Sequence, residues 1–316
     1  MSHPPSGTWL LPNLVVFHML ATQKPRPERF AGIRNVFTRE RLIAATVAVA
    51  LGCTAFVFGL RWLESAITFR PERMSANESS PEGAESVWFT SADGTRLNGW
   101  FFETRVQPET ATIVFFHGNG GNISNVGWLG QHFAEHGFNV LLFDYRGYGA
   151  SDGVAGNESD LYADGDAAVA FVMKEKGARR DEIVLYGHSL GTTVVADVAS
   201  RGNYAAVVLE SGLSSASSVA ASALPWLPRF LHFLGKNRFE SARKLVSVKS
   251  PILIVHGDPD PTIRTTEAQV LFAAANEPKK LLIIPGAGHV VFGSAGEQYL
   301  IQLDQFIREA MIKGRS

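Results

Sequence analysis

VLYGHSLGTT, residues 184–193, places Ser189 between two glycines, after a run typical of a buried strand and before one typical of a helix. A Gly-x-Ser-x-Gly pattern alone is common enough by chance that its surroundings must decide its meaning. Gly187 and Gly191 suit a sharp turn in which the strand and helix backbones approach closely. We therefore expect this turn to lift the Ser189 hydroxyl out of the edge of a sheet, with a plain helix cap as the alternative interpretation.

Short apolar runs alternate with helix-like segments from residue 111 onward, which predicts an α/β domain with a mostly parallel, doubly wound sheet. Asp93-Gly94, between two β-rich runs, predicts an antiparallel hairpin that opens this domain. Functional sites in such sheets form beyond the carboxyl ends of the strands. The predicted strands are residues 111–116, 139–143, 182–186, 205–209, 251–256 and 280–284, and the predicted helices are residues 124–136, 157–176 and 190–201.

The stretch FFHGNGGN, residues 115–122, is expected to leave a strand end close to Ser189. Its glycines free backbone N–H groups to point into the same space, as an oxyanion hole requires. We assign the two donors to the amides of Asn119 and Leu190. A phosphate-binding loop is the alternative, but no Gly-Lys-Ser/Thr follows the glycines.

A serine hydroxyl is a weak nucleophile that needs a base, and the base needs a group that orients it. His289 follows the strand predicted at residues 280–284 and is our candidate base. Three other histidines near strand ends are rival bases, for which we favour structural roles: His117, His188 and His256.

Asp258 and Asp260 both follow the strand predicted at residues 251–256, and either could orient His289. We favour Asp260, because it lies further into the loop and is bracketed by two stiffening prolines. Asp258 remains the alternative. The order serine, aspartate, histidine along the chain is the one expected when the nucleophile comes from the middle of such a sheet.

Other patterns point away from metals, cofactors and nucleic acids. His132 and His136 lack the His-Glu-x-x-His order of a zinc site, so we expect no metal and no cofactor. The chain has 29 Lys and Arg against 30 Asp and Glu, without a basic stripe, which argues against nucleic-acid binding. The glycine-rich stretch at residues 144–153 is expected either to shape the floor of the site or to form ordinary turns.

An uncharged apolar run at residues 42–60 is nearly long enough to cross a bilayer and predicts one transmembrane helix. A buried soluble helix, a cleaved signal and a lipoprotein box ending at Cys53 are the alternatives. The larger excess of Lys and Arg precedes the run, which places the N-terminus in the cytoplasm. We expect a cytoplasmic extension at residues 1–41, a linker at residues 61–83 and a catalytic domain at residues 84–316.

An insert at about residues 212–247 separates two of the predicted strands. Its apolar residues suit a small helical cap that lines an acyl pocket, and packing on the core explains them equally well. The candidate substrate-binding residues are Trp226, Leu227 and Phe230.

Seven motifs follow one another in order: HGNGGN at 117–122, DYRGYGASDG at 144–153, GHSLG at 187–191, LESG at 209–212, PWLPRF at 225–230, HGDPD at 256–260 and GAGH at 286–289. In these the chain resembles the α/β-hydrolase superfamily over about residues 85–313. More narrowly, it resembles a membrane-anchored subgroup that includes protein-depalmitoylating thioesterases and many bacterial hydrolases. The resemblance implies Ser189 as nucleophile, His289 as base and Asp260 as acid, with oxyanion donors at the amides of Asn119 and Leu190. The long N-terminal extension departs from the pattern and makes Met19 an alternative start.

We expect a serine hydrolase that cleaves carboxylic esters or thioesters through an acyl-enzyme. Simple ester and lipid substrates are favoured over peptides, because neither a gating domain nor a pocket acid suited to an amino terminus is evident. A peptidase and a catalytically idle hydrolase-fold scaffold at the membrane are the alternatives. Dehalogenase chemistry would require an aspartate at position 189, where this chain has serine.

The charge pattern predicts that the catalytic domain lies on the side of the membrane opposite the cytoplasm. Protease added outside intact cells or spheroplasts should therefore digest this domain. If the domain is digested only after the cells are lysed, the orientation is the opposite one. Release of the protein by high-salt washing would contradict a spanning helix.

Overall fold

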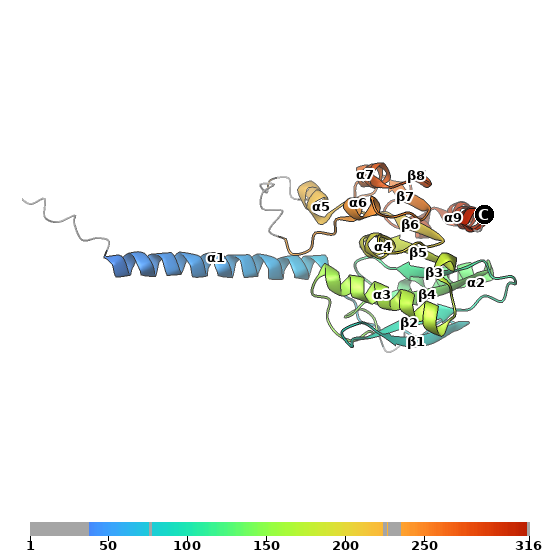
Figure 1. Ribbon diagram of the computed structural model, residues 1–316, viewed down its shortest axis with the longest axis horizontal. Helices are drawn as coiled ribbons and strands as arrows, with labels where there is room; N and C mark the ends of the chain where they lie inside the picture. Colours follow the sequence, from blue (N-terminus) through green and yellow to red (C-terminus); the bar gives the residue numbers. More distant parts are fainter. Residues whose placement is uncertain (1–37, 76–77, 224–225, 227–234, 315–316) are drawn as a thin grey trace, which may run out of the picture. The chain divides into compact units, whose positions relative to one another are not determined.

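The structure, a computed structural model, describes residues 38–75, 78–223, 226 and 235–314. The chain divides into two compact units, Met1–Cys53 and Thr54–Ser316. Helix α1 (Arg39–Thr68) crosses this division (Figure 1). Its part Arg39–Trp62 is long and apolar enough to cross a membrane, so the helix is a candidate span where the apolar run predicts one.

An eight-stranded sheet forms the centre of the second unit, in the order β1-β2-β4-β3-β5-β6-β7-β8 (Figure 1). β2 is antiparallel to β1 and β4, and the other neighbouring pairs are parallel. This confirms the predicted mostly parallel sheet, and the Asp93-Gly94 turn joins β1 to β2 as expected. The strands are β1 (Ala84–Thr90), β2 (Arg96–Phe102), β3 (Ala111–Phe116), β4 (Phe138–Phe143), β5 (Ile183–His188), β6 (Ala206–Glu210), β7 (Ile252–Asp258) and β8 (Lys279–Pro285).

Helices cover both faces of the sheet. Residues of α3, α4, α6 and α7 share one apolar core with one face, and residues of α2 and α9 share a second core with the other face. Because both faces are covered, the central strands are continuous apolar runs. The helical segments of this unit that the structure describes are η1 (Ile123–Val126), α2 (Gly127–Glu135), α3 (Glu158–Glu175), η2 (Arg180–Glu182), α4 (Gly191–Ala199), α5 (Ala216–Ala223), α6 (Ser241–Leu245), α7 (Thr266–Ala274), α8 (Val291–Ser294) and α9 (Gly296–Gly314).

The helix predicted at residues 124–136 begins as a 3₁₀ turn, η1, before it continues as α2. The side chain of Asn122 accepts the N–H of Ser124 at 2.8 Å, and the side chain of Asn125 accepts the N–H of Asn122 at 3.0 Å. This reciprocal capping satisfies N–H groups that would otherwise lack partners at the start of a helix. It also fixes the point at which the glycine-rich loop after β3 ends.

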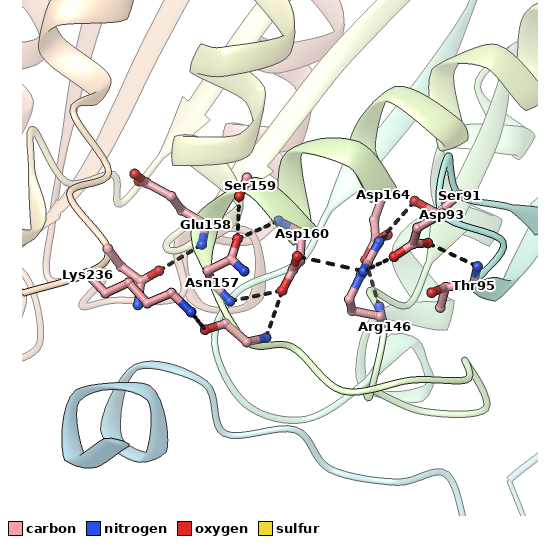
Figure 2. A network of polar contacts seen from close by, with 12 residues as sticks. Ser91, Asp93, Thr95, Arg146, Asn157, Glu158, Ser159, Asp160, Asp164 and Lys236 are labelled. Carbon is pink, nitrogen blue, oxygen red and sulfur yellow. Dashed lines mark hydrogen bonds and ion pairs between the residues drawn. The ribbon is translucent and has the colours of Figure 1, made fainter. Parts of the chain in front are cut away.

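A buried ion pair attaches the loop at residues 144–153 to α3 and to the β1–β2 hairpin. Figure 2 shows Arg146 between Asp164 and Asp93, with nitrogen-to-oxygen distances of 2.7 Å and 2.6 Å. Arg146 and Asp164 are both buried. Removing one partner of such a pair leaves an uncompensated buried charge and costs about 3–5 kcal/mol of stability. The loop that follows β4 is therefore fixed to α3 and to the β1–β2 hairpin.

Candidate active site

Ser189 occupies the turn between β5 and α4, with a left-handed φ of 52°. Residues other than glycine rarely adopt this conformation, and it persists only where surrounding contacts hold it. Here the backbone N–H of Ser189 donates to the carbonyl of Glu210, at the end of β6, at 2.9 Å. Gly191 permits the tight approach of α4, because a Cβ there would lie 2.0 Å from the carbonyl oxygen of Phe116.

Three side chains from three separate loops form a continuous series of hydrogen bonds. Nε2 of His289 lies 3.0 Å from Oγ of Ser189, and Nδ1 of His289 lies 2.7 Å from Oδ2 of Asp260. The three loops follow β5, β7 and β8, whose carboxyl ends meet at one edge of the sheet. An imidazole placed in this way can take the serine proton, while the carboxylate stabilises the imidazolium that results.

The loops that carry Asp260 and His289 touch through their backbones. A Cβ built at Gly257, near the end of β7, would lie 2.0 Å from the carbonyl oxygen of Gly288. Any side chain at position 257 would therefore push the two loops apart. The N–H of Gly286 also donates to the carbonyl of Asp258, which joins the start of the His289 loop to the end of β7.

Four donors surround the carboxylate of Asp260. Burial opposes its ionisation, but Nε2 of His256 lies 3.1 Å from Oδ2, and the N–H groups of Ile263 and Thr262 donate to Oδ1 at 2.9 Å and 2.7 Å. With His289 as the fourth donor, these contacts hold the pKa of Asp260 well below its usual value. Because the ionised carboxylate accepts from Nδ1 of His289, Nε2 of His289 can accept a hydrogen bond from the Ser189 hydroxyl.

Asp258, the alternative acid, has different surroundings. Its side chain is exposed, and its Oδ1 accepts from the hydroxyl of Thr265 at 3.2 Å. The structure thus brings Asp260, rather than Asp258, into contact with His289. The bend after Asp258 carries the chain onward to Asp260, which points back toward the site.

The glycine-rich loop after β3 lies directly beside the serine. A Cβ built at Gly118 would lie 3.3 Å from Cβ of Ser189 and 3.0 Å from Nδ1 of His188. Asn119 is the next residue of this loop, and Leu190 follows Ser189 at the start of α4. Leu190 is thus adjacent to Ser189 in the chain, and Asn119 follows a residue that lies beside Ser189. The positive end of the α4 dipole adds to their attraction for a developing negative charge.

The three rival histidines occupy structural positions. Nε2 of His188 lies 3.1 Å from the carbonyl of His289, so it supports the backbone of the candidate base. Burial lowers the pKa of His188 to about 3 and that of His117 to about 4, which keeps both rings neutral at physiological pH. His256 lies beside Asp260 and is fully buried. His117 and His188 therefore add no charge beside His289.

Glu210 is a member of the site that our sequence analysis did not single out. Its buried carboxyl accepts from the hydroxyls of Tyr186 and Tyr299 at 2.5 Å and 2.7 Å, and from the N–H of Phe292 at 3.1 Å. Burial raises the pKa of Glu210, and these donors oppose that effect. Its backbone carbonyl holds Ser189, so one residue braces both the nucleophile turn and the helix that follows His289. The LESG motif was the only sequence signal for it.

The predicted substrate-binding residues are only partly described. The side chain of Trp226 is 75% exposed, whereas Leu227 and Phe230 lie outside the described residues. Helix α5 of the same insert borders a cavity of about 240 Å³ beside the loop that carries Asp260. Its lining residues are Val219, Ser222, Pro261, Thr262, Ile263, Arg264 and Glu267.

His132 and His136, the histidine pair weighed as metal ligands, stack with their ring centroids 4.3 Å apart. Nδ1 of His136 also lies 2.7 Å from the carbonyl of His132, so the pair makes ordinary contacts within one helical turn. In the part of the chain that the structure describes, no three His, Cys, Asp or Glu residues are grouped so that they could hold a metal ion.

Comparison with known proteins identifies several relatives. A family described as serine aminopeptidase, S33, matches residues 107–246. The protein YfhR of Escherichia coli (strain K12) is 35% identical over 241 residues, which cover 73% of this chain and 83% of YfhR. The human alpha/beta hydrolase domain-containing protein 17B is 34% identical over 246 residues, which cover 76% of this chain and 82% of that protein.

Solved structures share the fold at lower identity. An esterase from Pyrococcus furiosus superposes with a TM-score of 0.61 at 20% identity, over 77% of this chain and 98% of the esterase. The esterase domain of a Rhodothermus marinus protein gives a TM-score of 0.51 at 22% identity, over 73% of this chain and 96% of that domain.

The contacts of the two aspartates predict different effects of their substitution. Asp260→Asn should leave His289 in the wrong tautomer and slow the reaction of Ser189 with a fluorophosphonate on the order of 10⁴-fold. Asp258→Asn is the matched control and should react at nearly the unaltered rate. The acid assignment is wrong if Asp258→Asn shows the large loss and Asp260→Asn does not.

Proposed function

Because this chain belongs to the α/β-hydrolase family, we propose that it is a serine hydrolase that cleaves carboxylic esters or thioesters through an acyl-enzyme. The observation that carries the proposal is the hydrogen-bonded series from Ser189 through His289 to Asp260. A scaffold would have no need to keep this series intact around a strained serine, so the geometry favours an enzyme over an idle fold.

In the proposed acylation step, Oγ of Ser189 attacks the substrate carbonyl carbon while Nε2 of His289 takes the hydroxyl proton. The carbonyl oxygen becomes an oxyanion, which would accept hydrogen bonds from the amides of Asn119 and Leu190. When the tetrahedral intermediate collapses, the bond to the leaving oxygen or sulfur breaks, and His289 donates its proton to that atom. The acyl group then remains on Ser189.

Deacylation repeats these steps with water. His289 removes a proton from the water, the resulting nucleophile attacks the acyl carbonyl, and the proton returns to Oγ of Ser189 as the carboxylic acid leaves. Asp260 keeps its negative charge throughout, because the donors around it hold its pKa low. The carboxylate therefore stabilises the imidazolium of His289 in both steps.

The surroundings of His289 support an apolar acyl group. The side chains of Val290 and Trp128 are 42% and 44% exposed. The rings of Trp128 and Phe292 pack together with their centroids 6.1 Å apart. We propose that these side chains, the cavity beside α5 and the residues Trp226, Leu227 and Phe230 contribute to the acyl site. The cavity of about 240 Å³ has a mixed lining, with Val219, Pro261 and Ile263 beside Ser222, Thr262, Arg264 and Glu267, and its volume suits only part of an acyl chain.

We also propose that α1 anchors the enzyme in a membrane as a single span, with residues 1–41 in the cytoplasm and the catalytic domain on the opposite side. Two features support this proposal. Arg39–Trp62 is long and apolar enough to cross a bilayer, and the larger basic excess lies on its N-terminal side. An anchored enzyme would meet substrates that reside in the same bilayer.

Ser189→Ala should abolish turnover of p-nitrophenyl esters and acyl thioesters, because it removes the hydroxyl that lies 3.0 Å from Nε2 of His289 and would form the acyl-enzyme. The melting temperature should change little, since the substitution removes one oxygen at the end of the sheet. The measurement compares initial rates and melting curves of the two full-length proteins in detergent.

Two further results bear on the alternatives. Turnover that persists in folded Ser189→Ala would falsify the nucleophile, and an unaltered protein without turnover on any ester or thioester would favour a scaffold. The serine aminopeptidase description of the matching family makes amino-acid p-nitroanilides the appropriate test of a peptidase. A higher kcat/KM for these amides than for esters would replace the proposed activity.

Longer acyl chains should be better substrates, because each buried methylene contributes about 0.8 kcal/mol of transfer free energy. From acetyl to octanoyl esters, kcat/KM should rise severalfold to roughly a hundredfold before the pocket ends. Val219→Trp, which fills part of the cavity beside α5, should move the preferred length to a shorter chain. A series of p-nitrophenyl esters measures both effects.

Val270→Trp is the matched control for this series, since Val270 is exposed on α7 and does not line the cavity. It should leave the length preference unchanged. If acetyl and butyryl esters are cleaved as well as octanoyl esters, the insert packs on the core without forming an acyl site, and the proposed triad is unaffected.

A further inference from the structure

The segment that follows α1 makes a direct contact with the loop of the proposed oxyanion hole. The backbone N–H of Arg70 donates to Oδ1 of Asn119 at 2.8 Å, although 49 positions separate the two residues. The hydroxyl of Tyr148 donates to the same oxygen at 3.1 Å. The exposed side chain of Asn119 is thus held between residue 70 and the loop after β4.

Residues 69–75, which we name the strap, are fixed to the loop at residues 144–153 by paired backbone bonds. The N–H of Gly149 donates to the carbonyl of Glu72 at 2.9 Å, and the N–H of Met74 donates to the carbonyl of Gly149 at 3.1 Å. The guanidinium of Arg73 donates to the carbonyls of Ser151 and Gly153. The strap therefore follows the outside of a loop that the buried Arg146 ion pair already holds in place.

The N-terminal end of the strap is also attached to the catalytic domain. Phe69 is buried and packs edge-on against Phe239, with ring centroids 6.3 Å apart. One turn earlier, the carboxylate of Glu64 in α1 accepts the N–H groups of Lys236 and Asn237 at 2.6 Å and 2.8 Å.

Beyond the strap, Glu78 accepts from the Ser75 N–H at 2.6 Å and from the Ser124 hydroxyl at 2.8 Å. Ser124 belongs to η1, which begins directly after the glycine-rich loop. Chain segments on both sides of the strap thus hold it in register with the loop that contains Asn119.

We propose that the strap positions the glycine-rich loop after β3. The Arg70 N–H would act through the side chain of Asn119 and thereby hold the backbone N–H of Asn119 toward Ser189. This inference rests on the proposed function. The loop contains glycines at positions 118, 120 and 121, so its backbone has more freedom than most. A tether at Asn119 restricts that freedom where a donor must be fixed before the reaction, because an oxyanion donor works best when it needs no reorganisation.

The test uses the full-length protein in detergent, with kcat and KM for p-nitrophenyl butyrate. Arg70→Pro removes the N–H that Asn119 accepts, and Pro71 already restricts residue 70 to extended conformations that proline can adopt. Loss of a whole oxyanion donor lowers kcat by about 10²–10³-fold, so loss of its tether should lower kcat about tenfold with KM nearly unchanged. Arg70→Ala is the matched control, because it removes the side chain and keeps the N–H, and it should match the unaltered protein.

Asn119→Ala keeps the test decisive if Arg70→Pro does not fold. Because it removes the contacts of both Arg70 and Tyr148, kcat should fall at least tenfold. The double variant should be no slower than Asn119→Ala alone, since Asn119→Ala already removes the oxygen to which the Arg70 N–H donates. Equal kcat for Arg70→Pro and Arg70→Ala, or effects that multiply in the double variant, would overturn the inference. If the unaltered protein turns over no more substrate than Ser189→Ala does, the proposed function itself is refuted. That comparison separates failure of the proposed function from failure of this inference.

Discussion

The hydrogen bond from the N–H of Ser189 to the carbonyl of Glu210 is the contact on which the rest of the site depends. It joins the end of β6 to a turn whose left-handed backbone would otherwise cost about 1 kcal/mol or more. The carboxyl of the same Glu210 holds Tyr186, Tyr299 and the start of α8. One buried residue thus connects the serine turn, the centre of the sheet and the segment after His289, so Ser189 and His289 keep their spacing through shared attachments.

Local patterns in the sequence were sufficient for the sheet and for the main side chains of the site. The signals used were the Asp93-Gly94 turn, apolar runs of strand length and glycines after helices, and each depends on neighbouring residues only. The predicted strands begin and end within one or two residues of those in the structure. The side chains of Ser189, Asp260 and His289 could be proposed because parallel strands bring their carboxyl ends to one edge, whatever the loops between them do.

Contacts between distant segments were not predictable in the same way. Glu210 acts through partners that its neighbours in the sequence do not indicate, and a buried carboxyl between two tyrosines has no local pattern. The strap is a clearer case. Its composition is typical of a linker, but most of its bonds are made by backbone N–H and C=O groups, which every residue type carries and which composition therefore cannot reveal.

The short distance from the candidate span to the strap has a consequence for the range of molecules that the enzyme could reach. α1 continues without interruption from Trp62 to Thr68, a rise of about 9 Å, and the strap begins at the next residue. With Arg39–Trp62 in a bilayer, that rise is close to the thickness of one headgroup layer. The search for substrate would then be confined to two dimensions, and effective concentration at the membrane surface would add to any selection that the pocket makes.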